Sequence, residues 1–164
     1  MSLLGICQWI QQTSVSVSIR ESIWVYPILN VLHCVGILLV AGTIVVVDLR
    51  LLGFGMRRAP VSSVVAQVVP WTLTGFAFML ITGSMLGWSE PLKLYHSPFF
   101  RWKLGFLALA GLNALVFHCG IFRSAARWDT ASPAPGRARL AGLLSIVSWI
   151  CVIAAGRAVG YETR

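Results

Sequence analysis

Residues 22–47 read SIWVYPILNVLHCVGILLVAGTIVVV, and this uncharged stretch decides the fold. An α-helix of about 20 apolar residues crosses the hydrocarbon core of a bilayer, so the stretch predicts a membrane-spanning helix. Asn30 and His33 nevertheless lie within it. Because an unpaired polar group in hydrocarbon is costly, we expect the imidazole of His33 to be hydrogen-bonded, to face a cavity or to bind a ligand.

The composition of the whole chain is typical of a membrane protein. Of its 164 residues, 57% are hydrophobic and only 11% are charged, whereas soluble domains carry about 25% charged residues. The net charge is +8. Its cations lie in connecting segments, which favours anionic lipid headgroups as partners and leaves no basis for nucleic acid binding. The length accommodates a single membrane domain, residues 1–164.

Three further apolar stretches predict three further spans. We therefore expect an all-α, integral membrane four-helix bundle with an N-terminal interfacial amphipathic helix. The expected ranges are 2–13 for the interfacial helix and 22–49, 66–88, 99–122 and 140–160 for the spans. Pro60 and Pro70 predict a short separate helix before the second span and a kink inside it. Residues 90–98 and 123–139 predict connecting loops.

The arrangement of charges gives an orientation. Four spans place both termini on one side of the membrane, and slightly more Lys and Arg residues lie in the linkers on the other side. By the positive-inside rule, both termini are then expected outside the cytoplasm. No Lys or Arg precedes Arg20, and no small-residue cleavage pattern follows, so we do not expect a removable signal peptide.

The four cysteines are scattered, at Cys7, Cys34, Cys119 and Cys151. Without a C-x-x-C motif they predict neither a thioredoxin-like site nor covalent haem attachment, and we expect them to be free, buried residues. The adjacent pairs at 33–34 and 118–119 suggest copper, which binds both thiolate and imidazole. Consecutive helical side chains point about 100° apart, however, so one pair does not easily chelate one ion.

Three histidines are the candidate metal or haem ligands: His33, His96 and His118. Neutral imidazole is an axial ligand of haem iron, and helical bundles build such sites from facing helices. At the α-helical rise, His33 lies ~16 Å and His118 ~28 Å from the same end, whereas an axial pair needs similar depths. His96, reaching down from its loop, and Met79 also compete for the second position. The alternative is that these histidines are hydrogen-bonded core residues.

Charged residues near the helix ends add two further hypotheses. Arg101, Lys103 and Arg157 lie on the side of His33, where they could bind haem propionates or extend to lipid phosphates. Asp48 lies near the opposite end. Two interpretations fit Asp48. One is an ion pair or cap with Arg50, Arg57 or Arg58, and the other is coupling to His118 in a proton path.

Several stretches resemble a family of small bacterial membrane proteins known as a domain of unknown function. They are residues 22–27, His33 with Gly36, Gly42, residues 48–53, residues 98–103, and Asn113 with His118. A looser similarity, at His33 and Lys103-Leu104, runs to haem-associated membrane proteins such as the HemJ-type protoporphyrinogen oxidase. CopD-type copper-resistance proteins are similar at His33. The near resemblance implies the fold and a bacterial inner membrane, and the distant ones imply haem b and electron transfer.

Two hypotheses from different classes follow. The first is a b-type cytochrome-like membrane protein that transfers electrons between a quinone or periplasmic redox protein and a bound haem b. Its candidate site residues are His33, His118, His96, Arg157, Lys103 and Arg101. The second is a cofactor-free membrane anchor or scaffold subunit for a partner enzyme, whose histidines only pack. A third interpretation, porphyrinogen oxidation, lacks a complete catalytic set, and a homo-oligomer stays open.

Overall fold

The computed structural model describes residues 2–131 and 134–162, and this part of the chain is helical with no strand. The elements are α1 (Leu3–Gln11), α2 (Ser14–Glu21), α3 (Val25–Leu52), α4 (Val61–Ser89), α5 (Pro91–His96), α6 (Pro98–Cys119), the 3-10 helix η1 (Ile121–Arg127) and α7 (Gly136–Tyr161). Four of them, α3, α4, α6 continued by η1, and α7, are long and apolar enough to cross a membrane. This confirms the expected all-α class and the four long apolar helices.

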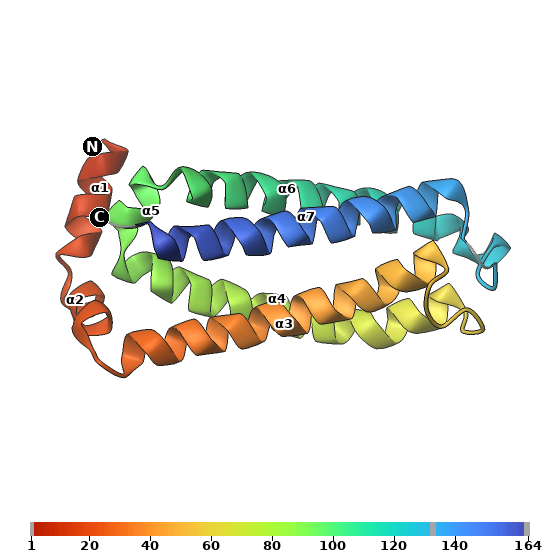
Figure 1. The fold of residues 1–164 in the computed structure, drawn as a ribbon, viewed down its shortest axis with the longest axis horizontal. Helices are drawn as coiled ribbons and strands as arrows, with labels where there is room; N and C mark the ends of the chain where they lie inside the picture. Colours follow the sequence, from red (N-terminus) through yellow and green to blue (C-terminus); the bar gives the residue numbers. More distant parts are fainter. Residues whose placement is uncertain (1, 132–133, 163–164) are drawn as a thin grey trace.

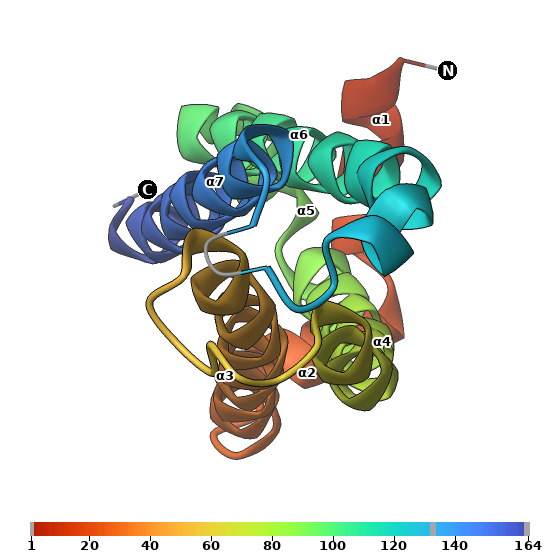
Figure 2. The same ribbon diagram turned by 90° about the vertical axis from the view of Figure 1, so that its right-hand side faces the viewer.

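The four long helices form two pairs. Helix α3 packs along α4, α6 packs along α7, and α3 also contacts α7. Among the described residues, α4 and α6 make little contact, so the bundle is less closed on that side. Seen along the bundle, the α3–α4 pair lies beside the α6–α7 pair (Figure 2). Both termini lie at the same end (Figure 1).

Helix α4 differs from its prediction. The expected separate helix after Pro60 is wrong, because a single helix runs from Val61 to Ser89 with Pro70 inside it. Proline lacks a backbone N–H, so it removes one helical hydrogen bond. The other backbone hydrogen bonds of the 29-residue helix keep it continuous across Pro70. The hydroxyl of Thr74 donates to the carbonyl oxygen of Pro70 at 2.9 Å.

The N-terminal end contains more helix than the sequence predicts. Residues 14–21 form a second short helix, α2, and α5 replaces the expected loop after residue 90. Helix α2 is fixed to the end of α4, because Ser16 Oγ and Arg20 Nη1 donate to the carbonyl oxygen of Ser89 at 3.1 and 3.3 Å. These bonds satisfy a carbonyl that the helix end leaves without an intrahelical donor.

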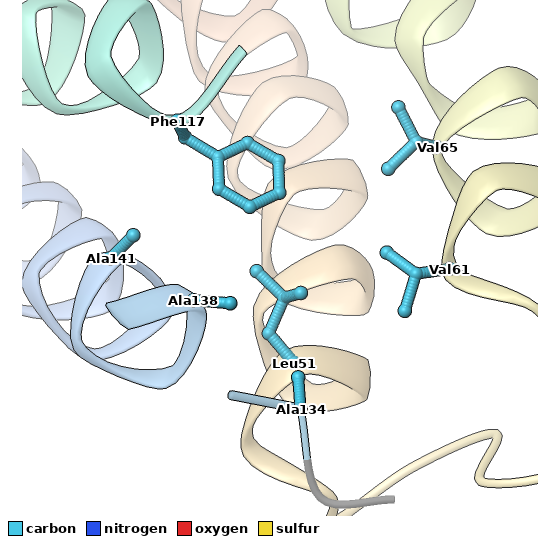
Figure 3. Packing of buried hydrophobic residues seen from close by; sticks show 7 residues of the cluster. All are labelled: Leu51, Val61, Val65, Phe117, Ala134, Ala138 and Ala141. Carbon is cyan, nitrogen blue, oxygen red and sulfur yellow. The ribbon is translucent and has the colours of Figure 1, made fainter. Parts of the chain in front are cut away.

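The main apolar core lies at the opposite end of the bundle. It consists of Leu51, Val61, Val65, Phe117, Ala134, Ala138 and Ala141. The side chains from the four long helices and the linker converge on Leu51, which is 1% exposed (Figure 3). A second cluster lies further along the bundle and includes Val40, Met79, Ala110, Trp149 and Val152.

Arg50 connects the two loops at the core end. It is fully buried, and its guanidinium donates to the carbonyl oxygens of Ala59 at 2.8 Å, Ala131 at 3.1 Å and Asp129 at 3.3 Å. The expected ion pair or cap between Asp48 and Arg50 is therefore wrong, because the guanidinium is directed to loop carbonyls instead.

Asp129, in the linker before α7, caps the start of α4 from a distance. Its carboxylate accepts from the Ser62 backbone N–H at 2.7 Å and from the Ser62 hydroxyl at 2.6 Å. Its carbonyl oxygen accepts from the Val61 N–H at 3.0 Å. Helix N-termini leave backbone donors unpaired, and Pro60 cannot cap them, so a residue far along the chain does so.

We predict that Arg50→Lys lowers the free energy of unfolding by about 3 kcal/mol, because an ammonium group cannot reach three carbonyl oxygens with the geometry of a guanidinium. Unfolding in mixed detergent and SDS micelles, followed by tryptophan fluorescence, measures the change. Arg58→Lys is the matched control, since Arg58 is exposed. Equal stability of the two variants would contradict this role for Arg50.

The cap on α4 predicts a dependence on pH. Hydrogen bonds from the Ser62 hydroxyl and backbone N–H hold the pKa of Asp129 below its ordinary value. The stabilisation is therefore complete above the ordinary pKa and is lost as pH falls through the lower, folded-state pKa. At pH 7 we expect Asp129→Asn to unfold about 1 kcal/mol more easily than the parent chain. The difference between the two unfolding curves should begin to shrink as pH falls below about 4, near the ordinary pKa, and should vanish only below the lower, folded-state pKa of Asp129. A constant difference would exclude the ionised cap.

Candidate functional site

The contact between α3 and α4 positions His33. The ring is half-buried and lies against Gly83, where a Cβ atom would approach its Cε1 to 3.0 Å. One turn further along α3, Gly36 packs as closely on Met79. Small residues on both helices thus let the backbones approach, and the imidazole occupies the space in front of Gly83.

A hydrogen bond to Thr82 determines which ring nitrogen of His33 is free. The Thr82 hydroxyl donates its proton to the carbonyl oxygen of Phe78, 2.9 Å away. His33 Nδ1 lies 2.9 Å from Thr82 Oγ1, and with the hydroxyl hydrogen directed to Phe78 we assign the N–H of the ring to Nδ1. Since neutral imidazole carries one proton, this arrangement leaves the lone pair of Nε2 available to a ligand. Metal-binding histidines are commonly oriented in this way by a bond from the other nitrogen.

His33 lines a cavity of about 340 Å³ between the four long helices, on the side of the bundle that carries the termini. We call it the His33 cavity. Its apolar walls include Ile37, Leu86 and Trp149, and Met79 also lines it. Met79 belongs to the same α3–α4 wall as His33, since it packs on Gly36. The cavity volume falls within the ~300–1,000 Å³ of small-molecule and cofactor sites.

Two cations from α6 and α7 lie in the same cavity, Lys103 and Arg157. The alkyl chain of Lys103 crosses Gly156, where a Cβ atom would lie 3.6 Å from its Cε. The guanidinium of Arg157 lies 5.9 Å from the ring centre of Tyr161. Lys93 also lines the cavity and pairs with Glu90 at 3.9 Å. The cavity therefore combines apolar walls, one imidazole and several cations, a combination suited to an apolar ligand with acidic groups.

The structure places the other predicted site residues elsewhere. His118 lines a second cavity, with Asp48, and is not brought together with His33. His96 lies in α5, where its Nδ1 is 2.9 Å from the carbonyl oxygen of Leu92. Arg101 is exposed and does not line the His33 cavity. Of the six predicted residues, His33, Lys103 and Arg157 share one site.

The residues that the sequence alone did not identify are Thr82, Gly83 and Trp149. Thr82 and Gly83 lie together on α4, and both contact the His33 ring. Trp149 lines both cavities. The available sequence signal was a polar residue, Thr82, followed by Gly83 in an apolar span. Packing determines which helix faces this pair and at which residue, so the sequence did not show that the facing residue is His33.

The cysteines remain free thiols. Cys7, Cys34 and Cys151 are half-buried, while Cys119 is exposed, so the expectation of burial is wrong for Cys119. Among the described residues, no three His, Cys, Asp or Glu side chains come together as ligands of a metal ion.

The comparison with known families shows where this chain belongs. A model described as a family of unknown function (DUF6644) matches residues 12–162. No curated protein and no solved structure matches the chain. The looser similarity to HemJ-type and CopD-type proteins thus stays a prediction.

The contact with Thr82 predicts the tautomer of His33. We expect the parent protein to show the Nδ1–H form in two-bond ¹H–¹⁵N correlation spectra of histidine-labelled protein, with the signal assigned by a His33→Gln variant. Thr82→Val removes the acceptor and should abolish the preference for this form, whereas Thr82→Ser should keep it. An Nε2–H signal in the parent protein would contradict the arrangement.

Proposed function

The chain belongs to the family of unknown function DUF6644, and from this premise we propose that it is an integral membrane protein that holds a b-type haem in the His33 cavity and uses it for electron transfer. The proposal rests on the residues of this chain, because the family carries no assigned activity. Its parts are the membrane location, the haem ligand and the redox role.

The outward faces of the long helices support the membrane location. Large apolar side chains there are half to three-quarters exposed, among them Val31, Leu38, Leu80, Leu112 and Ile150. Such a surface would be unfavourable in water and is the ordinary surface of a protein in lipid. We infer a multi-pass protein of a bacterial inner membrane with both termini outside the cytoplasm, because the linkers opposite the termini carry the small excess of cations.

The short helices at the end with the termini fit the membrane interface. Helix α1 lies across that end of the bundle rather than along it (Figure 1). Leu3 and Trp9 of α1 are each about two-thirds exposed, as expected for side chains that enter the boundary between headgroups and acyl chains. We therefore retain the interfacial role for α1 within the proposal.

The orientation of the His33 ring is the main observation that supports the haem proposal. Its Nδ1 is bonded to Thr82, so Nε2 can serve as an axial ligand. Ile37, Leu86 and Trp149 offer apolar surface for a macrocycle. Lys103 and Arg157 can pair with propionates, a recognition in which charge-assisted hydrogen bonds are strong. The bound haem would supply a one-electron redox centre.

The geometry also limits the ligand set. His118 and His96 do not line the cavity, and Met79 lies on the same wall as His33, so we propose that His33 is the histidine that would hold the haem iron. The redox partner would be a quinone of the bilayer or a periplasmic redox protein, because the cavity lies toward the end of the bundle that carries the termini.

The absorption spectrum tests this function. We expect protein purified in mild detergent from haem-replete cells to show a Soret band that responds to dithionite. His33→Ala should lower bound haem at least about tenfold, as expected for loss of the ligand. His118→Ala should retain the haem, because His118 lines the other cavity.

Two results would reject the proposal. One is colourless parent protein, which would instead favour a cofactor-free anchor or scaffold subunit. The other is equal loss of haem in the His33→Ala and His118→Ala variants, which would show a general effect on folding rather than loss of a ligand.

A further inference from the structure

A second cavity lies between α4 and α6, where the bundle is least closed. Its volume is about 290 Å³, and all four long helices contribute to its lining. We call it the Asp48 cavity. The apolar core forms part of its wall, since Leu51, Val65 and Phe117 line it and converge in Figure 3. The lining is much more apolar than polar, and exposed residues of α4 and α6 lie at its edge.

The cavity contains a buried carboxyl group without a full set of partners. Asp48 is 5% exposed, and its Oδ2 atom has no hydrogen-bond partner among the described residues. Ser145 interacts with the carboxyl group from α7. An ionised carboxylate in apolar surroundings is very unfavourable unless a cation or several donors compensate it. The unpartnered oxygen therefore calls for a proton or a positively charged ligand.

No Lys or Arg side chain among the described residues forms an ion pair with Asp48. The nearest in sequence, Arg50, uses its guanidinium on the carbonyl oxygens of Ala59, Ala131 and Asp129. The ion pairs of the described residues join Arg20 to Glu21 and Lys93 to Glu90, and neither includes Asp48. His118 lines the same cavity, but among the described residues it forms no ion pair or hydrogen bond with Asp48. A cation from outside the chain can therefore supply the counter-charge.

The other groups of the cavity suit the apolar part of such a ligand. Phe76, Phe117 and Trp149 line it, and aromatic faces attract organic cations as well as apolar groups. The amide of Asn113 is already used, because its Nδ2 donates to the carbonyl oxygen of Ala141 at 2.9 Å. The Thr72 hydroxyl donates to Thr43 at 2.9 Å. Among the described residues that line this cavity, Asp48 thus keeps a buried oxygen atom without a hydrogen-bond donor.

We propose that the Asp48 cavity binds a small lipophilic ammonium ion, with the ammonium group on Asp48 and the apolar part between Phe76, Phe117 and Trp149. The ligand enters from the bilayer through the side where α4 and α6 make little contact. This site is separate from the His33 cavity and does not depend on a bound haem.

The test compares two probes of the same shape. 2-Phenylethylamine is charged at pH 7 and 2-phenylethanol is neutral. Equilibrium dialysis of each labelled probe against the full chain in phosphatidylcholine nanodiscs, with empty nanodiscs subtracted, measures binding. We expect saturable binding of the amine, and at least about tenfold weaker binding of the alcohol, because a charge-assisted hydrogen bond is lost.

Two variants connect the binding to the cavity. Asp48→Asn should weaken binding of the amine at least about tenfold. Gly111→Leu should block the cavity, since Gly111 lines it and a Cβ atom there meets no atom within 4 Å. Gly105→Leu is the matched control on the same helix, with the same open surroundings but outside both cavities, and should bind as the parent does.

The outcomes separate the proposal from its alternatives. If the Asp48→Asn variant does not fold, the comparison of amine binding between the Gly111→Leu and Gly105→Leu variants tests the proposal. No saturable binding of the amine would overturn the proposal and indicate that a proton alone compensates Asp48. Equal binding of amine and alcohol, or amine binding unchanged in Gly111→Leu, would overturn it as well. Unchanged binding of the amine in the His33→Ala variant would show that the Asp48 cavity binds it whether or not a haem is held by His33.

Discussion

The close packing of α3 on α4 is the contact on which the rest of the structure depends. Glycines make it close: a Cβ atom at Gly36 would lie 2.8 Å from Met79, and one at Gly75 would lie 2.9 Å from Val40. Without side chains at these points, dispersion contacts and interhelical hydrogen bonds can form along the pair. The same proximity brings the hydroxyl of Thr82 to the imidazole of His33 and so determines which nitrogen can bind a ligand.

The weak contact between α4 and α6 has the opposite consequence. The two helix pairs meet mainly through the contact of α3 with α7, and space remains between them at two depths. The cavity toward the termini carries His33, Lys103 and Arg157, and the other carries Asp48. Trp149 lines both. One bundle therefore has an apolar cavity lined by cations and another that contains a carboxyl group, and we propose ligands of opposite charge for them.

Polar groups that complete the helix ends hold this arrangement in place. At the core end, Arg50 and Asp129 join loops that are far apart in the sequence. At the other end, Ser16 and Arg20 of α2 bond the last carbonyl of α4. Helix ends leave backbone groups unpaired, and these long-range bonds satisfy them without needing regular caps. The two cavities thus lie between bundle ends that are joined by hydrogen bonds.

The sequence by itself determined the helical class and the four long apolar helices, because hydropathy and length are properties of single segments, and it showed that His33 lies within one of them. It also predicted that Lys103 and Arg157 lie near the same end of the bundle as His33. The tertiary structure alone decided that His118 belongs with Asp48 rather than with His33, and that Arg50 binds loop carbonyls rather than Asp48. It likewise decided that Thr82 orients the imidazole. These facts depend on helix register and rotation, which packing sets and which no local pattern encodes.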